Sequence, residues 1–291
     1  MTAHGAPETF TSGETGNVGG LGRRLAFAAG DRALDALERA RGTGAELDRL
    51  AGDVPQRGVV VLGAYVEGGG RLPAAVRELR RSRHHVELAL CARGSAHPDL
   101  AGVTVLERHP GAKFENVNAA AAAHRERGGA WPPDWALVVD DDVDLPGRFL
   151  DRFLGLCERF GLSLAQPAQT LRSHAAWGHV RRRPGSLLRE TRFVEIGPVT
   201  AFRGEAAAEL MPFPEVGQGW GLDLHWGAVA EERGWRSGIV DALPVRHESQ
   251  LIGVTYSGGE ALESARRFLA ERPYLSSSAA RETLATHRRV S

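Results

Sequence analysis

The chain has 291 residues, 42% hydrophobic and 25% charged, enough for one large α/β domain or a domain with an appendage. Its 36 basic and 36 acidic residues cancel, which argues against a protein built to coat nucleic acid or an anionic membrane. No apolar run approaches the roughly 18 residues that cross a bilayer, and the start of the chain does not resemble a signal peptide, so we expect a cytoplasmic protein. Cys91 and Cys157 are too few for a disulfide framework and are expected to be buried thiols.

The choice of basic residues is unusually uniform. Of the 36, only Lys113 is lysine, and asparagine occurs only as Asn17, Asn116 and Asn118. Lysine is a compact point charge and arginine a bulky planar fork, so a tight phosphate or ribose pocket distinguishes them. We therefore expect Lys113, Asn116 and Asn118 to contact a phosphate or ribose, with chance survival of these residue types as the alternative.

Residue patterns divide the chain into four segments. Residues 1–19 have no apolar period and are predicted to be a disordered tail. Residues 20–57 carry spaced leucines interrupted by a Gly-Thr-Gly turn, which predicts a helical extension, and residues 20–50 of it are a candidate homodimer surface. Residues 58–250 form the predicted main domain, and residues 251–291 are predicted to be a C-terminal loop and helices.

Strands and helices alternate through the first half of the main domain. The apolar run Val59–Ala64 is typical of a strand buried on both faces of a parallel sheet. The same reasoning predicts strands at Val86–Cys91, Val103–Glu107 and Trp135–Val139, and helices at Leu72–Arg81, Asn118–Arg127 and Arg148–Phe160. This alternation predicts an α/β fold with a doubly wound, mostly parallel sheet that binds ligands at the carboxyl ends of its strands.

The pattern is more mixed in the second half of the chain. Short strands are predicted at Leu162–Ala165, Phe193–Phe202 and Gly238–Asp241. Two C-terminal helices, Ala261–Arg272 and Ala279–Arg288, are predicted on either side of a serine-rich break.

The strongest chemical signal is the acidic run Asp-Asp-Asp-Val-Asp at residues 140–144, directly after a predicted strand. Adjacent carboxylates repel one another, and a divalent cation removes that repulsion. Carboxylate oxygens suit Mg²⁺ or Mn²⁺, and such ions leave positions for a substrate phosphate. The pattern therefore predicts a metal site that binds a nucleoside diphosphate, with a solvated acidic turn as the alternative.

Three segments together resemble the GT-A fold of nucleotide-sugar glycosyltransferases. They are AYVEGGGRLPAAVREL from residue 64, WALVVDDDVDLPGRFL from residue 135, and PEVGQGWGLDLHWGAVAEERGWRSGIVDALPVRH from residue 214. The third is similar to segments of a GT-A-like domain family of unknown function found in plants and bacteria. The resemblance covers roughly residues 58–250 and implies a GT-A-like catalytic domain.

The resemblance implies roles on the donor side of a site. It places Asp142 on the metal, Mn²⁺ or Mg²⁺, with Asp140 and Asp141 near the ribose and the ion. His247 matches a late histidine that many such enzymes use as a further metal ligand, and imidazole suits Mn²⁺ beside carboxylates. The alternative for His247 is an ordinary loop histidine.

The nucleoside would lie between Tyr65 and Glu67. Many relatives carry an acid that reads uracil where this chain has Arg93, so a UDP-sugar is favoured without being secured. The acceptor is expected to be a small molecule or a glycan, and no nucleic-acid partner is expected.

The acceptor side is predicted around the Gly-Trp-Gly-Leu-Asp segment at residues 219–223. Two glycines around Trp220 make a tight turn with a rigid apolar wall, and Asp223 beside it is positioned to take a proton from an acceptor hydroxyl. The resemblance implies that this acid is the general base of an inverting transfer; the alternative is that Asp223 caps the following helix. Glu195 lies in an apolar stretch and either binds acceptor or pairs with Arg192 or Arg203.

Two other functions fit parts of the pattern. The Asp-x-Asp-Val sequence after an apolar strand is typical of haloacid-dehalogenase-like phosphatases, but these place it on the first strand and need a later lysine. A non-catalytic nucleotide- or sugar-binding module on the same scaffold would be expected to have lost some of its acids, and here all are present. The sequence therefore favours a metal-dependent glycosyltransferase.

Overall fold

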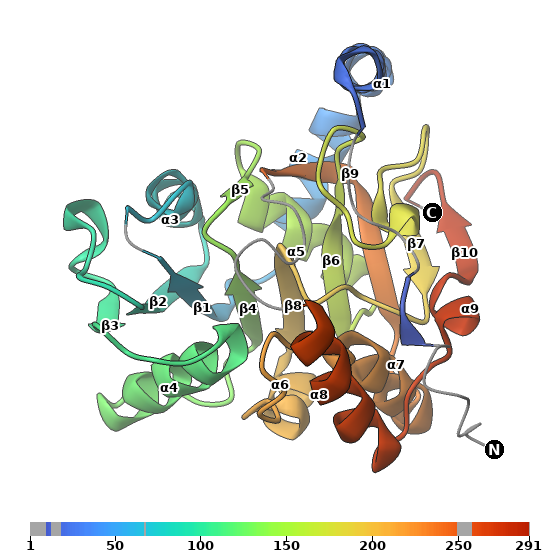
Figure 1. Ribbon diagram of the computed structural model, residues 1–291. Coiled ribbons are helices and arrows are strands. Elements are labelled where there is room, and N and C mark those ends of the chain that lie inside the picture. Colours follow the sequence, from blue (N-terminus) through green and yellow to red (C-terminus); the bar gives the residue numbers. More distant parts are fainter. Residues whose placement is uncertain (1–9, 13–18, 67, 249–257, 291) are drawn as a thin grey trace.

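The computed structural model describes residues 10–12, 19–66, 68–248 and 258–290 (Figure 1). Its strands are β1 (Gly58–Tyr65), β2 (His85–Ala92), β3 (Thr104–Leu106), β4 (Trp135–Val139), β5 (Val143–Asp144), β6 (Leu164–Gln169), β7 (Leu188–Thr191), β8 (Val199–Arg203), β9 (Ser237–His247) and β10 (Thr283–His287). Its helices are α1 (Leu21–Ala40), α2 (Thr43–Asp53), α3 (Leu72–Leu79), α4 (Lys113–Glu126), α5 (Phe149–Arg159), α6 (Gly204–Leu210), α7 (Leu222–Arg233), α8 (Gly258–Ala270) and α9 (Ser277–Ala280).

One mixed sheet organises the described residues, in the order β10-β7-β9-β6-β8-β4-β1-β2-β3, with β5 attached to β9. The pairs β1–β2, β2–β3, β1–β4 and β6–β9 are parallel. Along this path β8 and β7 are antiparallel to both of their neighbours, so the other strands all run the same way. The predicted α/β class with a mostly parallel sheet is confirmed.

Side chains that alternate along β1 divide the core into two layers. Val60 and Leu62 face a cluster that includes residues of α4, α6, α7 and α8, whereas Val59 and Val61 face a cluster with α2, α3 and α5. Both faces of the sheet are therefore covered by helices, which explains the uninterrupted apolar run of the central strands (Figure 1).

The strand order reverses at β1, which has β2 and β3 on one side and β4 on the other. Such a reversal opens a crevice at the carboxyl ends of the two strands, where open α/β sheets bind their ligands. Here those ends are Tyr65 on β1 and the acidic residues that follow β4.

The C-terminal part differs from the expectation. Residues Ala279–Arg288 were predicted as a helix, but the structure has the short α9 followed by strand β10, which pairs antiparallel with β7. Exposure alternates residue by residue along β10, as expected for an edge strand with one face on the core. The strand predicted at Phe193–Phe202 is shorter in the structure, where β8 begins at Val199.

The N-terminal helices confirm the predicted pair of helices. Helix α2 packs against α5 so closely that a Cβ on Gly155 would lie 3.0 Å from the backbone nitrogen of Ala51. Most of the tail at residues 1–19 lies outside the described residues, but Phe10 is buried in the core and corrects the prediction of disorder at that position. No helix in the described ranges combines the length and apolarity required to span a membrane.

Candidate metal centre and active site

The acidic run after β4 meets the end of β9 through a two-residue ladder. Strand β5 pairs antiparallel with β9, so that Val143 lies opposite His247. This pairing places Asp142, the residue before β5, against the imidazole: Nε2 of His247 lies 3.1 Å from Oδ1 of Asp142. Two segments far apart in sequence are thus joined at the carboxyl end of β4.

Asp140, Asp142 and His247 form a group of potential metal ligands. One ligand atom from each lies within 4.8 Å of the others. Two carboxylate oxygens and one imidazole nitrogen are a donor set that suits Mn²⁺. The structure thus adds Asp140 to the two residues assigned to the metal from sequence.

The hydrogen bonds of His247 fit a metal ligand. Its backbone N–H donates to Oγ of Ser173 at 3.1 Å, and its Nδ1 lies 3.2 Å from the carbonyl oxygen of His174. A carbonyl oxygen can only accept a hydrogen bond, so Nδ1 of His247 carries the proton. In the neutral ring, Nε2 then has no hydrogen, and its lone pair points at a second acceptor, the carboxylate of Asp142. That contact requires a proton or a cation. Burial disfavours the charged ring, but Asp142 and Asp140 outweigh it and raise the pKa of His247.

Lys113, the first residue of α4, lies beside the same acids. Its Nζ is 2.6 Å from Oδ1 of Asp140 and donates to the carbonyl oxygen of Ile196, also at 2.6 Å. The single lysine therefore relieves part of the carboxylate repulsion itself. Gly197 packs directly against this ion pair. A Cβ at this position would lie 2.4 Å from Oδ2 of Asp140 and 3.0 Å from the lysine Nζ, so a larger residue would collide with the pair.

Asp141 is not part of this group of potential ligands and bonds to the segment after β1. Its Oδ2 accepts the backbone N–H of Val66 at 3.0 Å, and its carbonyl accepts that of Arg71 at 2.6 Å. Burial raises the pKa of its carboxyl to about 6. The same carbonyl explains why residue 70 is a glycine. Its φ is +51°, and a Cβ at this position would lie 2.4 Å from the carbonyl oxygen of Asp141. Asp141 thus joins the ends of β1 and β4 at the crevice.

Glu195 is a buried carboxyl group in the segment before β8. Its carboxyl oxygens accept hydrogen bonds from Nε2 of Gln169 at 2.6 Å and from the backbone N–H of Ala176 at 3.2 Å. Arg192 and Arg203, the partners considered for it from sequence, pair with other glutamates instead. Burial raises the pKa of Glu195 to about 8, and the charges of His247, Asp223 and Lys113 all act on it.

Asp223 occupies the first turn of α7. Its Oδ1 accepts the backbone N–H of Leu224 at 2.9 Å. Burial raises its pKa to about 7, against backbone N–H groups and the Trp177 side chain, which lower it. The sequence led us to expect this carboxylate to face an open cleft, but the residue is only 5% exposed. The structure therefore supports the helix-terminus alternative for Asp223 and corrects the expected exposure to an open cleft. As a general base, Asp223 would need the acceptor to reach a buried carboxylate.

Several residues assigned to the nucleotide from sequence are engaged elsewhere. Tyr65 is 1% exposed and its hydroxyl lies 2.7 Å from Oγ1 of Thr104, so its ring offers no face to a nucleoside. Asn116 is fully buried and bonds to His109 and Gly111. The corrected role of both side chains is structural.

The remaining assignments have mixed outcomes. The Asn118 side chain makes two hydrogen bonds to the backbone of Phe213, at 2.7 and 2.8 Å, which is also a structural role. Arg93 is exposed at the end of β2, and Trp220 is partly buried against the core. Glu67 lies outside the described residues.

The loop at residues 170–176 was missed from the sequence. It supplies Ser173 and His174 to His247, and Ala176 to Glu195. Two of these three contacts use backbone atoms, which leave no signature in residue type. The available signal was the pair of glutamines in β6, Gln166 and Gln169, which are 0% and 1% exposed.

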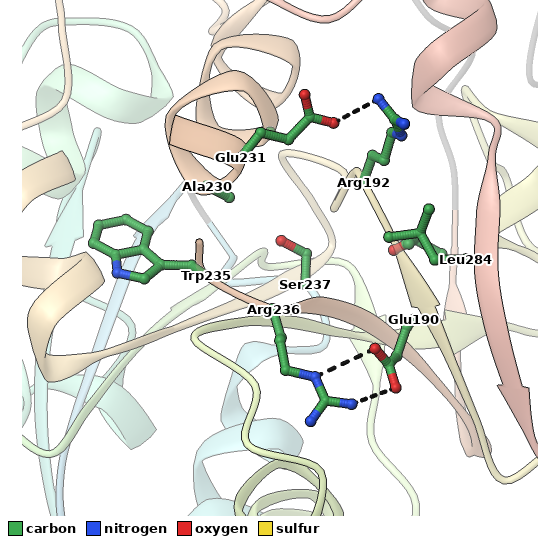
Figure 2. Close-up of a pocket in the computed structure, with 10 residues that line it drawn as sticks. Glu190, Arg192, Ala230, Glu231, Trp235, Arg236, Ser237 and Leu284 are labelled. Carbon is green, nitrogen blue, oxygen red and sulfur yellow. Dashed lines mark hydrogen bonds and ion pairs between the residues drawn. The ribbon is translucent and has the colours of Figure 1, made fainter. Parts of the chain in front are cut away.

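A separate pocket of about 310 Å³ lies between α7 and the strands β7, β9 and β10 (Figure 2). Its charged side chains are paired with each other, Arg192 with Glu231 and Arg236 with Glu190. None of its lining residues belongs to the group around His247. We therefore place the candidate chemistry at the end of β4.

Among solved structures, one glycosyltransferase is similar to this chain in its arrangement of elements. The mannosyltransferase PcManGT from Pyrobaculum calidifontis, in complex with GDP-Man and Mn²⁺, matches with a TM-score of 0.45 and 16% sequence identity. The match covers 75% of this chain and 67% of that chain. No family model matches the sequence, and no curated protein matches it.

Proposed function

We propose that the protein is a metal-dependent glycosyltransferase that moves a sugar from a nucleoside-diphosphate sugar to an acceptor hydroxyl. The observation that carries the proposal is the convergence of Asp140, Asp142 and His247 within 4.8 Å at the carboxyl end of β4. Their position next to the strand-order reversal at β1 is where open α/β sheets bind nucleotides.

In this proposal Asp140, Asp142 and His247 hold the cation, and the imidazole nitrogen favours Mn²⁺ over Mg²⁺. The bound ion would neutralise part of the negative charge that develops on the departing nucleoside diphosphate. Lys113 holds Asp140 in place through its 2.6 Å contact and adds a positive charge to the same region. Arg93 and Asp141 remain candidates for the nucleotide side, and a UDP-sugar remains the favoured donor.

The acceptor side is proposed at Asp223, Glu195 and Trp220. Asp223 would take the proton of the attacking hydroxyl, and attack opposite the diphosphate would invert the anomeric configuration. A carboxyl with a pKa of about 7 matches the pH at which such a base operates. Glu195, with a pKa of about 8, would be mostly protonated at neutral pH and able to donate a hydrogen bond to an acceptor oxygen.

Simple observations distinguish this proposal from its two alternatives, a phosphatase and a non-catalytic binding module. The acidic residues follow β4 rather than the first strand of the sheet, which disfavours a haloacid-dehalogenase-like phosphatase. A non-catalytic module would bind a nucleoside diphosphate with metal but release no nucleoside diphosphate from any donor.

The first test is thermal unfolding with Mn²⁺, Mg²⁺ and a panel of nucleoside diphosphates that includes UDP and GDP. A ligand at 100 times its Kd stabilises the native state by about 2.7 kcal/mol, so binding appears as a clear rise in Tm. We expect Mn²⁺ to raise Tm, one diphosphate to raise it further only with metal, and chelator to abolish both effects.

His247→Ala should remove the rise in Tm caused by Mn²⁺. His225→Ala is the matched control, because Nδ1 of His225 also lies on a backbone carbonyl, that of Pro273 at 2.8 Å, away from the acids. A rise in Tm that is equal in both variants would contradict the metal centre. Binding that is normal, with no hydrolysis or transfer of any nucleotide sugar, would contradict the catalytic part of the proposal.

A further inference from the structure

Helix α1 has its charged and apolar sides in an unusual arrangement. At 100° per residue, its side toward the protein carries Asp31 and Glu38, and Asp31 is the one buried residue of the helix. The opposite side carries exposed apolar residues: Leu21, Leu25, Ala26, Ala29, Ala33, Ala36 and Leu37. We call these seven residues the outer stripe of α1.

Contacts with the protein account for the acids of α1. Asp31 accepts the backbone N–H groups of Leu171 and Arg172, at 2.9 and 3.3 Å. Asp35 pairs with the buried Arg182 at 2.5 Å. Glu38 accepts the hydroxyl of Thr43 at 2.7 Å. Each acid of this helix therefore has a partner elsewhere in the chain, and the side chain of Asp35 is still 49% exposed.

Arginines border the outer stripe. Arg32 and Arg39 fall at its edge on the helical wheel, and both are exposed. No acid of α1 falls within the outer stripe, so the solvent-facing half of the helix combines apolar side chains with positive charge. The chain is neutral as a whole, and this local asymmetry is invisible in its net charge.

The exposed leucines are concentrated on this helix. Leu21, Leu25 and Leu37 are 74%, 62% and 38% exposed, and among large hydrophobic residues in the described ranges only Val66 and Leu284 share this exposure. A helix packed for stability alone would turn its leucines inward and its acids outward. Figure 1 shows α1 at the edge of the molecule, with one side free of other elements.

We infer that the outer stripe of α1 binds an anionic lipid surface. Helices with an apolar face bordered by Arg lie in the headgroup region of anionic membranes, held by both apolar burial and charge. A second copy is disfavoured as the occupant, because a two-fold pairing of this face would oppose arginines with no acid between them. The inference does not depend on the proposed function.

The bound surface would lie close to the candidate metal centre. Leu171 and Arg172, whose N–H groups Asp31 accepts, belong to the loop that supplies Ser173 and His174 to His247. Asp31, in the middle of α1, and the candidate ligand His247 thus contact directly adjacent residues of one loop. Lipid bound at α1 therefore approaches the same end of the molecule as the site.

The test is co-sedimentation of the full chain with vesicles of phosphatidylcholine alone and with about one third phosphatidylglycerol. We expect binding to the anionic vesicles only, weakened by salt. Leu25→Glu and the double variant Arg32→Ser/Arg39→Ser should each lower affinity at least about tenfold. Leu284→Glu is the matched control, because Leu284 is 59% exposed but lies on β10, and it should bind as the wild type does.

Unchanged Tm in each variant will show that the fold is intact, as expected for exposed positions. Failure of the wild type to bind anionic vesicles overturns the inference, and so does equal binding by Leu25→Glu and the wild type. A concentration-dependent dimer that Leu25→Glu abolishes, without vesicle binding, would assign the outer stripe to a second copy instead. None of these readouts uses enzyme activity, so failure here and failure of the proposed function are distinguishable.

Discussion

Glu195 and Asp223 are two buried carboxyl groups with raised pKa values. Burial is the largest cause for each, and the charge of Asp223 raises the pKa of Glu195 further. Burial of a carboxyl group costs free energy of folding, and groups with strongly shifted pKa values cluster at functional sites. The two groups therefore have opposite proposed roles, with Asp223 accepting a proton and Glu195 keeping one.

The protonated state of Glu195 predicts a pH dependence of stability. Its folded-state pKa is raised from 4.5 to about 8, so its stabilising contribution is complete below pH 4.5 and is lost as pH rises through about 8. Between pH 5 and 9 the Tm of the wild type should fall more than that of Glu195→Gln. The glutamine fits, because Gln169 has an Oε1 without a hydrogen-bond partner in the described structure and can rotate to accept the new amide.

Thermal unfolding across this pH range measures the difference between the two proteins. Glu215→Gln serves as the control, since Glu215 is exposed and its substitution should leave the pH profile of the wild type unchanged. Parallel profiles for the wild type and Glu195→Gln would show that Glu195 is ionised throughout.

Asp223→Asn tests the base in the proposed transfer. The asparagine oxygen can still accept the N–H of Leu224, so the start of α7 should remain intact. Loss of basicity should lower kcat by roughly 10²–10⁴-fold, while the Kd for nucleoside diphosphate with Mn²⁺ stays near that of the wild type. In the wild type, kcat/KM should rise with pH up to about 7.

Steady-state kinetics and the anomeric configuration of the product check the assignment of Asp223. Full activity of the asparagine variant would return Asp223 to a helix-terminus role. Retention of configuration would equally remove the need for a base opposite the leaving group.

At the scale of elements, β7 and β9 are joined by a buried ion pair. Arg189 and Asp241 have fully buried side chains, and two guanidinium nitrogens donate to the carboxylate at 2.8 and 2.9 Å. The remaining donors go to the carbonyl oxygens of His179 and Arg181. This network fixes the strand that ends in His247 against the loop beside it.

Removal of one partner should therefore be costly. Arg189→Leu leaves an unpaired buried carboxylate and should lower the free energy of unfolding by about 3–5 kcal/mol. Arg236→Leu, which breaks the half-exposed pair with Glu190 at the start of β9, should cost about 1 kcal/mol or less. Urea unfolding of both variants measures the difference, and equal losses would contradict the assigned importance of burial.

At the scale of the whole molecule, the first half of the sheet could be predicted from the sequence because its strands are continuous apolar runs separated by helices. The sequence also pointed to Asp142 and His247, which the structure places side by side, because carboxylate and imidazole are typical metal ligands; the metal itself stays a prediction. β10 was missed because its partner, β7, lies about ninety residues earlier and a local pattern does not record that pairing.

Errors in the site have a similar physical origin. Tyr65 has the same parity along β1 as Val59 and Val61, so the period of two that defines a strand turns it into the core. Asn116 and Asn118 belong to a scarce residue type, but their amides bond to the backbone of Gly111, just before their helix, and of Phe213, after α6. The scarcity of a residue type therefore does not distinguish a contact with a ligand from a contact with the backbone.

The ladder between β5 and β9 also sets an order of events during synthesis. Asp142 and His247 are 247 − 142 = 105 residues apart, and at about 5–20 residues per second the ribosome needs roughly 5–20 s to make the intervening chain. Throughout that interval the acidic turn exists without its imidazole. The nascent chain therefore cannot assemble the complete ligand set until the whole of β9 has emerged, so capture of the ion by all three residues would mark a nearly finished sheet.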